Sequence, residues 1–234
     1  MYRFLTKAPL VKKIRENEWE ELAILCNASA LAVTIVTKVT RRNGSQQTYT
    51  SSSTITGGRM YLVAKCPGDE TFANVAKIEV WIEQLVESVS TRTTEIRTYY
   101  ADVTARKKPT RIGWLNTLGG VDYYTFTGAR ASEAAVERSE YVKDLPANFT
   151  VRDRTSAVLG SSLREEFEVV SDYEPETVYQ WLSKAITSPE VWIVQDGVLI
   201  PIMISSKSTP VENDALFQMK IKYHKSSDII SQNG

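Results

Sequence analysis

Apolar and polar residues alternate with a period of two along most of this chain, and no other feature limits its fold as strongly. Ile78, Val80 and Ile82, for example, alternate with Glu79 and Trp81. Successive side chains of a β-strand point to opposite faces, so this period indicates strands with one buried face. Together with β-branched and aromatic content, it predicts strands at 19–25, 33–40, 60–66, 77–83, 94–103, 111–115, 123–127, 191–194, 198–204 and 217–223. The pattern predicts a mainly β protein with sandwich-like or barrel-like antiparallel sheets.

Short turns containing glycine separate several of these stretches. Asn43-Gly44 and Asp196-Gly197 each predict a tight hairpin, because Asn, Asp and Gly tolerate the positive φ that such turns require. A further hairpin is predicted between residues 149–158 and 163–170, with Gly160-Ser161 at its turn. Together these turns favour antiparallel neighbours that follow one another along the chain.

Two segments of the second half have helical character. Residues 129–138 carry several Ala and Glu, and we expect one helical turn or a mobile loop there. A packed α-helix is predicted at about residues 175–187, since Pro175 suits a first helical position and Pro189 prevents continuation. Its apolar stripe consists of Val178, Trp181, Leu182, Ala185 and Ile186. That spacing places one face of the helix against a sheet.

A basic run followed by proline interrupts the strand pattern near the middle of the chain. The run is Arg106-Lys107-Lys108-Pro109, and we interpret it as a solvated linker rather than a phosphate contact. It divides the chain into an N-terminal β-sandwich-like domain, residues 1–106, and a C-terminal β domain, residues 107–234, which contains the helix.

Charge and hydropathy argue against a nucleic-acid partner and against a membrane span. The chain of 234 residues has 28 basic and 28 acidic side chains, whereas nucleic-acid-binding proteins usually show a clustered basic excess. No segment has the roughly 20 consecutive apolar residues that a membrane span needs. The N-terminal residues lack the apolar core of a signal peptide, so we expect an intracellularly assembled protein.

Residues able to carry chemistry are few and scattered. His224 is the one histidine, and Cys26 and Cys66 are far from it and from each other in sequence, without the paired spacing of a zinc site. We expect both cysteines to be buried free thiols. No Gly-x-Ser-x-Gly elbow is present, and Gly57-Gly58 and Gly119-Gly120 precede strands rather than helices. The sequence therefore predicts no catalytic residue, no cofactor and no metal.

Two kinds of site remain open alternatives. Glycosidases need only two carboxyl groups in one cleft, and the candidates here are Glu165, Glu166, Glu168, Asp172 and Asp122. Sugar-binding modules need exposed aromatic side chains, and the candidates are Trp81, Tyr99, Tyr100, Trp114, Tyr123 and Tyr124. The aromatic residues could equally form a protein interface or cover sheet faces within the fold.

Residues 111–126, RIGWLNTLGGVDYYTF, combine a strand ending in Trp-Leu-Asn, a Gly-Gly turn and an aromatic strand. This segment resembles one found in virion proteins of tailed bacteriophages that infect Bacteroidota. Two further stretches, Ser188-Pro189-Glu190-Val191-Trp192 and Asp196 to Ile202, resemble the helix-then-hairpin that follows in the same proteins. The structural motif consists of Trp114, Asn116, Gly119, Gly120, Asp122 and Phe126.

This resemblance implies a structural subunit of the phage tail or baseplate, of the distal-tail or adaptor kind. Such a protein acts by self-assembly and hetero-assembly, with other virion proteins as partners and a homo-oligomeric ring as its form. It resides in the virion tail after assembly in the host cytoplasm. Within the motif, Asn116, Gly119 and Gly120 are expected to shape the turn, with Trp114 and Phe126 filling the core beneath it. The alternatives are a carbohydrate-binding or host-receptor-binding β-sandwich module and a glycosidase-like enzyme.

Overall fold

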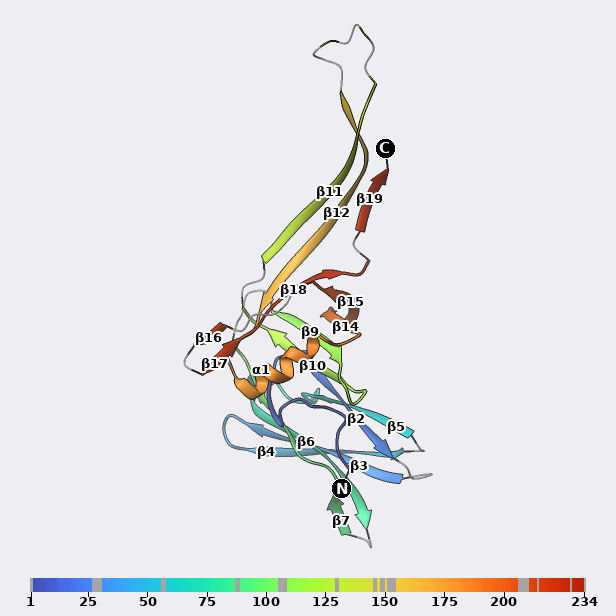
Figure 1. Ribbon diagram of the computed structural model, residues 1–234. Helices are drawn as coiled ribbons and strands as arrows, with labels where there is room; N and C mark the ends of the chain where they lie inside the picture. Colours follow the sequence, from blue (N-terminus) through green and yellow to red (C-terminus); the bar gives the residue numbers. More distant parts are fainter. Residues whose placement is uncertain are drawn as a thin grey trace. The chain divides into compact units, whose positions relative to one another are not determined.

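The computed structural model confirms a mainly β protein with a single short α-helix in its C-terminal half (Figure 1). It describes residues 2–26, 31–55, 58–86, 89–104, 109–128, 131–144, 147, 150, 155–205, 211–213, 215–227 and 229–233. The chain forms two compact units. The first unit comprises Met1–Arg106, Gly113–Tyr124 and Gln180–Pro189, and the second comprises Lys107–Ile112, Thr125–Tyr179 and Glu190–Gly234.

The first unit contains two antiparallel arrangements of strands and a short 3₁₀ turn. Its larger sheet has the order β1-β8-β6-β3-β4, with β7 also paired to β6, and β2 pairs separately with β5. The bounds are β1 Val11–Ile14, β2 Trp19–Cys26, β3 Leu31–Arg41, β4 Gln46–Ile55, β5 Gly58–Lys65, η1 Phe72–Asn74, β6 Val75–Val86, β7 Val89–Arg92 and β8 Arg97–Ala101. Within the larger sheet, β1 and β8 run parallel.

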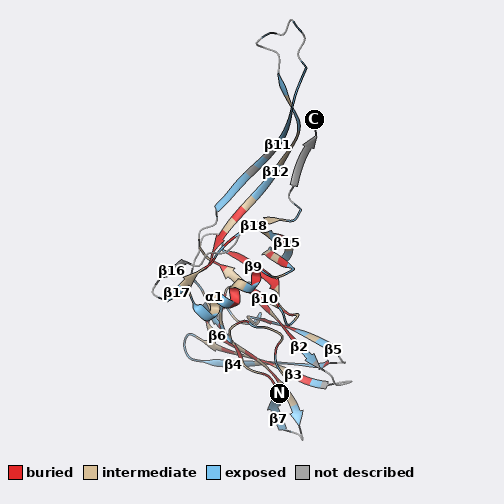
Figure 2. Cartoon of the chain, viewed as in Figure 1, coloured by how far each residue is buried: buried red, intermediate tan, exposed pale blue. Residues whose placement is uncertain are grey.

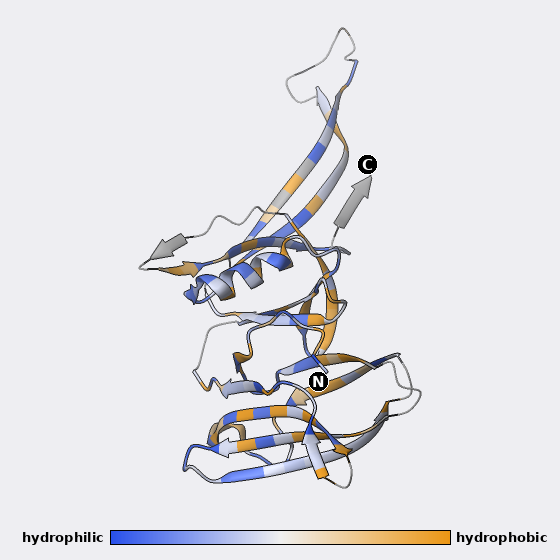
Figure 3. Ribbon diagram, turned by 60° about the horizontal axis from the view of Figure 1, so that its bottom comes forward, coloured by the Kyte–Doolittle hydropathy of each residue, from blue (hydrophilic) through white to orange (hydrophobic). Residues whose placement is uncertain are grey.

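The predicted alternation produces the core of this unit. Ile78, Val80 and Ile82 on β6 are buried, whereas Glu79 and Trp81 are half-buried on the other face. The same core cluster includes residues of β2 and β5, so the β2–β5 pair covers the larger sheet as in a sandwich. Figure 3 shows the alternation as successive blue and orange bands along the strands.

The predicted hairpin at Asn43-Gly44 is present between β3 and β4. Gly44 has a φ of 84°, and its N–H donates to the carbonyl oxygen of Arg41 over 2.9 Å. The second predicted turn, Asp196-Gly197, is likewise present, with φ values of 50° and 79°. Both turns use the left-handed backbone conformation that made them recognisable in the sequence.

The second unit contains a sheet in which β14, β15, β18, β12 and β11 are successive neighbours, while β19 also pairs with β12. A small sheet with the order β13-β17-β16 belongs to the same unit. The bounds are β11 Ala131–Val142, β12 Ser156–Val170, β13 Glu174–Pro175, β14 Val191–Gln195, β15 Val198–Ile204, β16 Val211–Asn213, β17 Leu216–Gln218, β18 Lys220–Lys225 and β19 Ile229–Asn233. The predicted strand at 217–223 is divided between β17 and β18.

Three elements pass from one unit into the other along the chain: β9 Thr110–Leu115, β10 Val121–Phe126 and α1 Glu176–Leu182. Residues 113–124 and 180–189, which the sequence analysis placed in the second domain, belong by their contacts to the first unit. The predicted boundary at Arg106–Lys107 lies outside the described residues.

The helix is shorter than predicted. It spans Glu176–Leu182 and continues as a 3₁₀ turn over Ser183–Ala185, and Pro175 precedes it in the short strand β13. Trp181, Leu182 and Ala185 of the predicted stripe are buried. Among the described residues, no helix has the length and apolar character required to cross a membrane.

Two predictions for residues 129–170 are wrong. The described residues from Ala131 onward form the long strand β11, not a helical turn or loop. Gly160-Ser161 is no hairpin turn, because β12 runs through it from Ser156 to Val170 and pairs with β11 along its length. Residues 149 and 151–154 of the predicted first arm lie outside the described residues. Cross-strand pairing along β11 therefore outweighs the weak helix propensity of Ala and Glu.

Candidate functional site

The predicted structural motif forms the turn between β9 and β10. The N–H of Asn116 donates to the carbonyl oxygen of Gly120, and that of Gly119 donates to the carbonyl oxygen of Asn116. The side-chain oxygen of Asn116 accepts from the N–H groups of Leu118 and Gly120 at 2.8 and 3.2 Å. Gly119 has a φ of 81°, which only glycine adopts without strain. Asn116 thus fastens this turn through both its backbone and its side chain.

Asp122 lies directly after this turn and is 1% exposed. Its carboxylate accepts hydrogen bonds from Thr6 Oγ1 at 2.5 Å, Asn116 Nδ2 at 2.9 Å and Trp181 Nε1 at 2.8 Å. Three donors offset much of the cost of burying one negative charge. A carboxylate engaged in this way serves as a structural anchor that joins the N-terminal segment, the motif turn and helix α1.

Lys12 occupies a second buried polar position in the same unit. Its Nζ lies 2.8 Å from Glu20 Oε2, donates to the carbonyl oxygen of Tyr123 at 2.7 Å and stands 5.1 Å from the ring centroid of Trp181. The side chains of Lys12 and Glu20 are 8% and 5% exposed. Each charge of this pair has a close partner of opposite charge. Like the Asp122 carboxylate, the pair therefore suits a structural role rather than proton transfer.

The aromatic members of the motif are buried. Trp114 is completely buried and packs on Trp181, with ring centroids 5.0 Å apart. Phe126 is 1% exposed and belongs to the second unit. The motif residues Trp114, Asn116 and Asp122 are therefore part of the interior of the first unit.

The carboxylate candidates do not gather as a set. Glu166 and Glu168 lie on one face of β12, while Asp172 accepts from the Thr127 hydroxyl and Asp122 belongs to the other unit. Glu165 is exposed and, by the alternation of the strand, lies on the opposite face of β12. Only two of the five candidates therefore share a surface.

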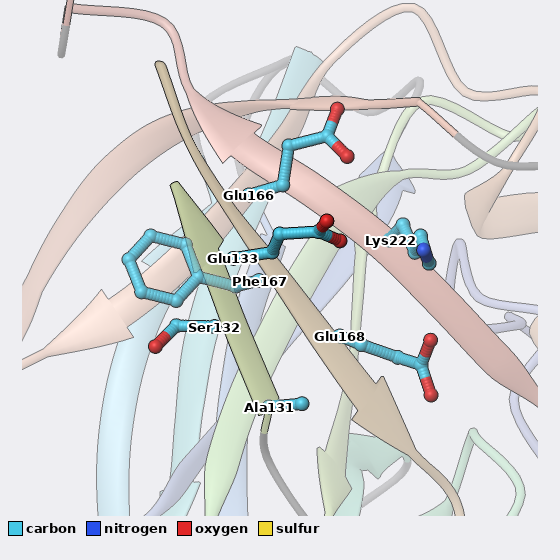
Figure 4. A pocket seen from close by; sticks show the side chains of 7 residues that line it. All are labelled: Ala131, Ser132, Glu133, Glu166, Phe167, Glu168 and Lys222. Carbon is cyan, nitrogen blue, oxygen red and sulfur yellow. The ribbon is translucent and has the colours of Figure 1, made fainter. Parts of the chain in front are cut away.

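Glu166 and Glu168 do line a shallow depression of about 320 Å³. Figure 4 shows their carboxylates, that of Glu133 and the amine of Lys222 on one side of the strands, with Phe167 turned to the other. The two β12 carboxylates are half-buried on an open sheet face. General acids of glycosidases occupy enclosed, dehydrated positions, which this acidic surface does not provide.

The sulfur and imidazole groups are not assembled into a site. Among the described residues, no group of three His, Cys, Asp or Glu side chains could hold a metal ion. Cys66 is a free, half-buried thiol whose pKa is raised by burial, which makes it a poor nucleophile at neutral pH. The side chain of Cys26 lies outside the described residues, and His224 on β18 is half-buried.

The aromatic candidates are mostly internal. Tyr99, Trp114 and Tyr123 are buried, and Trp81 and Tyr124 are half-buried. Tyr100, at 50%, is the exposed member of the six. A sugar-stacking platform needs several exposed rings on one surface, so these residues favour packing within the fold.

The largest exposed feature is a two-stranded antiparallel ribbon formed by β11 and β12. Every described side chain of β11 is exposed, and β12 is buried only near its C-terminal end (Figure 2). Residues 167–170 of β12 pair with β18 and residues 160–164 pair with β19. The remaining N-terminal part of β12 has β11 as its partner.

The two faces of the ribbon differ. Val136 pairs with Leu163, and Val158 and Val142 lie on the same face with exposures of 46% and 83%. We call this the apolar face, although Glu165, Arg138 and Glu140 also lie on it. At the base of the ribbon it continues into buried Phe167, whose ring stacks on Tyr223 with centroids 5.5 Å apart. The opposite face carries the acidic depression. Exposed apolar side chains gathered on one face of a ribbon indicate a surface that another molecule covers.

Sequence reasoning missed this ribbon because it read residues 129–138 as a helical turn or loop. A partial signal is present in β11, where Val136 and Val142 are six residues apart and therefore fit one face of a strand. Val158 and Leu163 are five residues apart, and only the bulge at Leu159 brings both to the same face. Comparison with models of protein families and with curated proteins finds no match for the chain.

Proposed function

We propose that this protein is a structural subunit of a tailed-phage virion, located in the tail or baseplate, which acts by assembling with copies of itself and with other virion proteins. The observation that carries the proposal is the exposed β11–β12 ribbon, with its apolar face and an outer edge that no described strand pairs with. Toward the N-terminal end of β12, beyond the residues paired with β18 and β19, β11 is its described partner, and a two-stranded ribbon is marginally stable in water. A partner that covers the apolar face and edge would stabilise it.

The remainder of the molecule supports an assembly role. Two buried polar clusters stabilise the first unit. One is formed by the hydrogen bonds to Asp122, and the other by the ion pair of Lys12 with Glu20. The equal numbers of acidic and basic residues weaken the long-range repulsion that would oppose dense packing of many copies. The resemblance of residues 111–126 to phage virion proteins supplies the choice of tail or baseplate.

Gradient sedimentation of a lysate from the native source tests this proposal. An antibody against the chain should detect it with large particles, and it should stay with them after a high-salt wash that removes weakly bound proteins. A soluble protein of similar mass in the same lysate is the control and should remain near the top of the gradient. A chain that stays with this control in every fraction would overturn the proposal.

A further inference from the structure

We propose that the outer edge of β11 pairs with the same edge of a second copy of this chain, antiparallel and about a two-fold axis that passes through Ser139. This inference deepens the assembly function proposed above and rests on it. It names the partner of the ribbon, a second copy, and the register in which the two strands meet.

The edge is long and regular. β11 stands at the end of its sheet and, among the described strands, pairs only with β12 (Figure 1). Ser139 pairs with Gly160 and Glu140 with Val158, so the extra residue of the bulge, Leu159, lies in β12 and β11 keeps its alternation. β11 has no proline, glycine or lysine, which are residues that commonly protect an edge from pairing.

Two-fold symmetry restricts the possible registers. When an antiparallel pair of identical strands lies in one sheet, residues directly opposite each other point to the same face. They must therefore be an even number of residues apart in the sequence. From one allowed register to the next, the two-fold axis moves by one residue along β11. In each register, the residue on the axis lies opposite the same residue of the second copy.

Charge selects one of these registers. With Ser139 on the axis, Arg138 of each copy lies opposite Glu140 of the other, and symmetry forms this pair twice. The next register on one side places Arg138 opposite Arg138, and the next on the other side places Glu140 opposite Glu140. Opposite charges across neighbouring strands stabilise a sheet and like charges destabilise it. Both side chains are exposed in the single chain.

The pairing is not already satisfied within the chain. The cross-strand neighbours of Arg138 and Glu140 on β12 are Ser161 and Val158, neither of which is charged. A partner in the proposed register supplies the complementary charges that β12 lacks. If the partner were an unrelated protein, the complementarity between β11 and a second copy of β11 would have no explanation.

The apolar residues agree with the same register. Val136 of one copy lies opposite Val142 of the other, again twice, and both belong to the apolar face of the ribbon. Joining the edges therefore forms one continuous sheet across the two copies, with the apolar faces of both ribbons on the same side. The other long edge, β4, carries no charged residue over Gln46–Ile55 and specifies no register of this kind.

A charge exchange in the purified full-length chain tests the register. Arg138→Glu and Glu140→Arg each place like charges opposite one another, and each should raise the dimer dissociation constant, measured by sedimentation equilibrium, about tenfold or more. The double variant restores opposite charges and should return to within about threefold of the unmodified chain. Arg164→Glu and Glu165→Arg make the same charge changes on exposed β12 positions and should leave the constant unchanged.

A cysteine at the axis provides a second measurement. Ser139→Cys places two thiols directly opposite, where the Cα atoms of paired strands are about 4.5–5.5 Å apart and a disulfide can form. Mild oxidation should link two copies covalently. Val142→Cys is the control, since its two copies would lie about 20 Å apart in this register. Efficient linkage of the control but not of Ser139→Cys would overturn the register.

The results separate this inference from the proposed function. The chain could sediment with particles in the lysate and yet be monomeric when purified, or form a dimer whose dissociation constant neither charge variant changes. Either result would support the proposed function and contradict the β11 pairing. A chain that dimerises with the predicted charge dependence but never sediments with particles retains the pairing and loses the virion assignment. Circular dichroism of each variant shows that the sheets are intact.

Discussion

Asp122 is the residue through which three separate segments of the first unit are tied together. Its carboxylate receives donors from Thr6, Asn116 and Trp181, and its burial leaves water no access to replace them. These buried polar groups hold separate segments of the unit together. Their contribution appears only when one of them is removed, because the remaining donors are then buried without an acceptor.

Replacement of Asp122 by alanine should strongly destabilise the protein. The change removes the acceptor of the buried Trp181 indole N–H and of the Thr6 hydroxyl, whereas Asn116 Nδ2 keeps the carbonyl oxygen of Leu5 as an acceptor. We therefore expect the free energy of unfolding to fall by about 3 kcal/mol. Urea denaturation followed by fluorescence measures this change. Asp69→Ala, at an exposed position, is the matched control and should cost less than about 0.5 kcal/mol. Equal effects for the two variants would contradict the anchoring role.

Gly120 is required by close approach of the backbone. A Cβ at this position would lie 2.1 Å from the carbonyl oxygen of Leu5, far inside contact distance. Gly120→Ala should therefore lower the free energy of unfolding by about 2–4 kcal/mol through displacement of the N-terminal segment. Gly68→Ala is the control, since its Cβ would meet nothing within 4 Å. The same small decrease in unfolding temperature for both variants would contradict the close approach of Gly120 to the Leu5 carbonyl group.

At the scale of elements, Glu70 ties the β3–β4 hairpin to the turn that precedes the 3₁₀ helix. Its carboxylate accepts from Arg41 at 2.5 and 2.8 Å and from the Tyr49 hydroxyl at 2.8 Å. These hydrogen bonds, Arg41 first, hold the pKa of Glu70 below its ordinary value of 4.5. The carboxylate therefore stabilises the fold above pH about 4.5, and this contribution disappears as the pH falls through the lowered pKa.

Glu70→Gln makes this pH dependence measurable. The variant should be less stable than the unmodified chain at pH 7, and the difference in unfolding free energy should shrink as the pH falls below about 4.5 and through the lowered pKa of Glu70. Glutamine resembles the protonated acid, so the two proteins converge when Glu70 takes up its proton. Glu16→Gln, at an exposed position, should show no such convergence. A difference that is constant with pH would exclude the ionised hydrogen bonds as its source.

The elements also show why one part of the sequence was misread. Residues 131–142 contain four alanine and glutamate residues before their first valine, a composition that favours helix when judged locally. In the structure this segment pairs along its whole length with β12, which begins only at Ser156. Local propensities differ by tenths of a kcal/mol per residue, so a continuous ladder of cross-strand pairs decides the outcome.

At the scale of the whole molecule, the two units are not successive pieces of chain. The first unit takes residues 113–124 and 180–189 from the second half of the sequence. These segments supply Asp122 to the hydroxyl of Thr6 and the Trp181 ring to Lys12. A fragment that ends near the basic run therefore lacks partners for its own buried polar groups.

We expect residues 1–106 to be unstable when expressed alone. Without Asp122, Trp181 and the Tyr123 carbonyl group, the Lys12–Glu20 pair is left partly uncovered, and the fragment should aggregate or unfold at a much lower temperature than the full chain. Thermal unfolding by circular dichroism, with the full chain as reference, measures this. A fragment with a cooperative transition at the temperature of the full chain would show that residues 1–106 are sufficient.

The sequence by itself determined the mainly β fold, most strand positions, two tight turns and the approximate helix. Each of these depends on a local signal: alternation sets which face of a strand is buried, and Asn-Gly or Asp-Gly sets the turn. The tertiary structure alone decided that Asp122 joins Thr6 to Trp181, that β12 runs through Gly160, and that β11 has β12 as its one partner among the described strands. These depend on pairing between residues distant in sequence, where long-range contacts rather than local preference decide the lowest free energy.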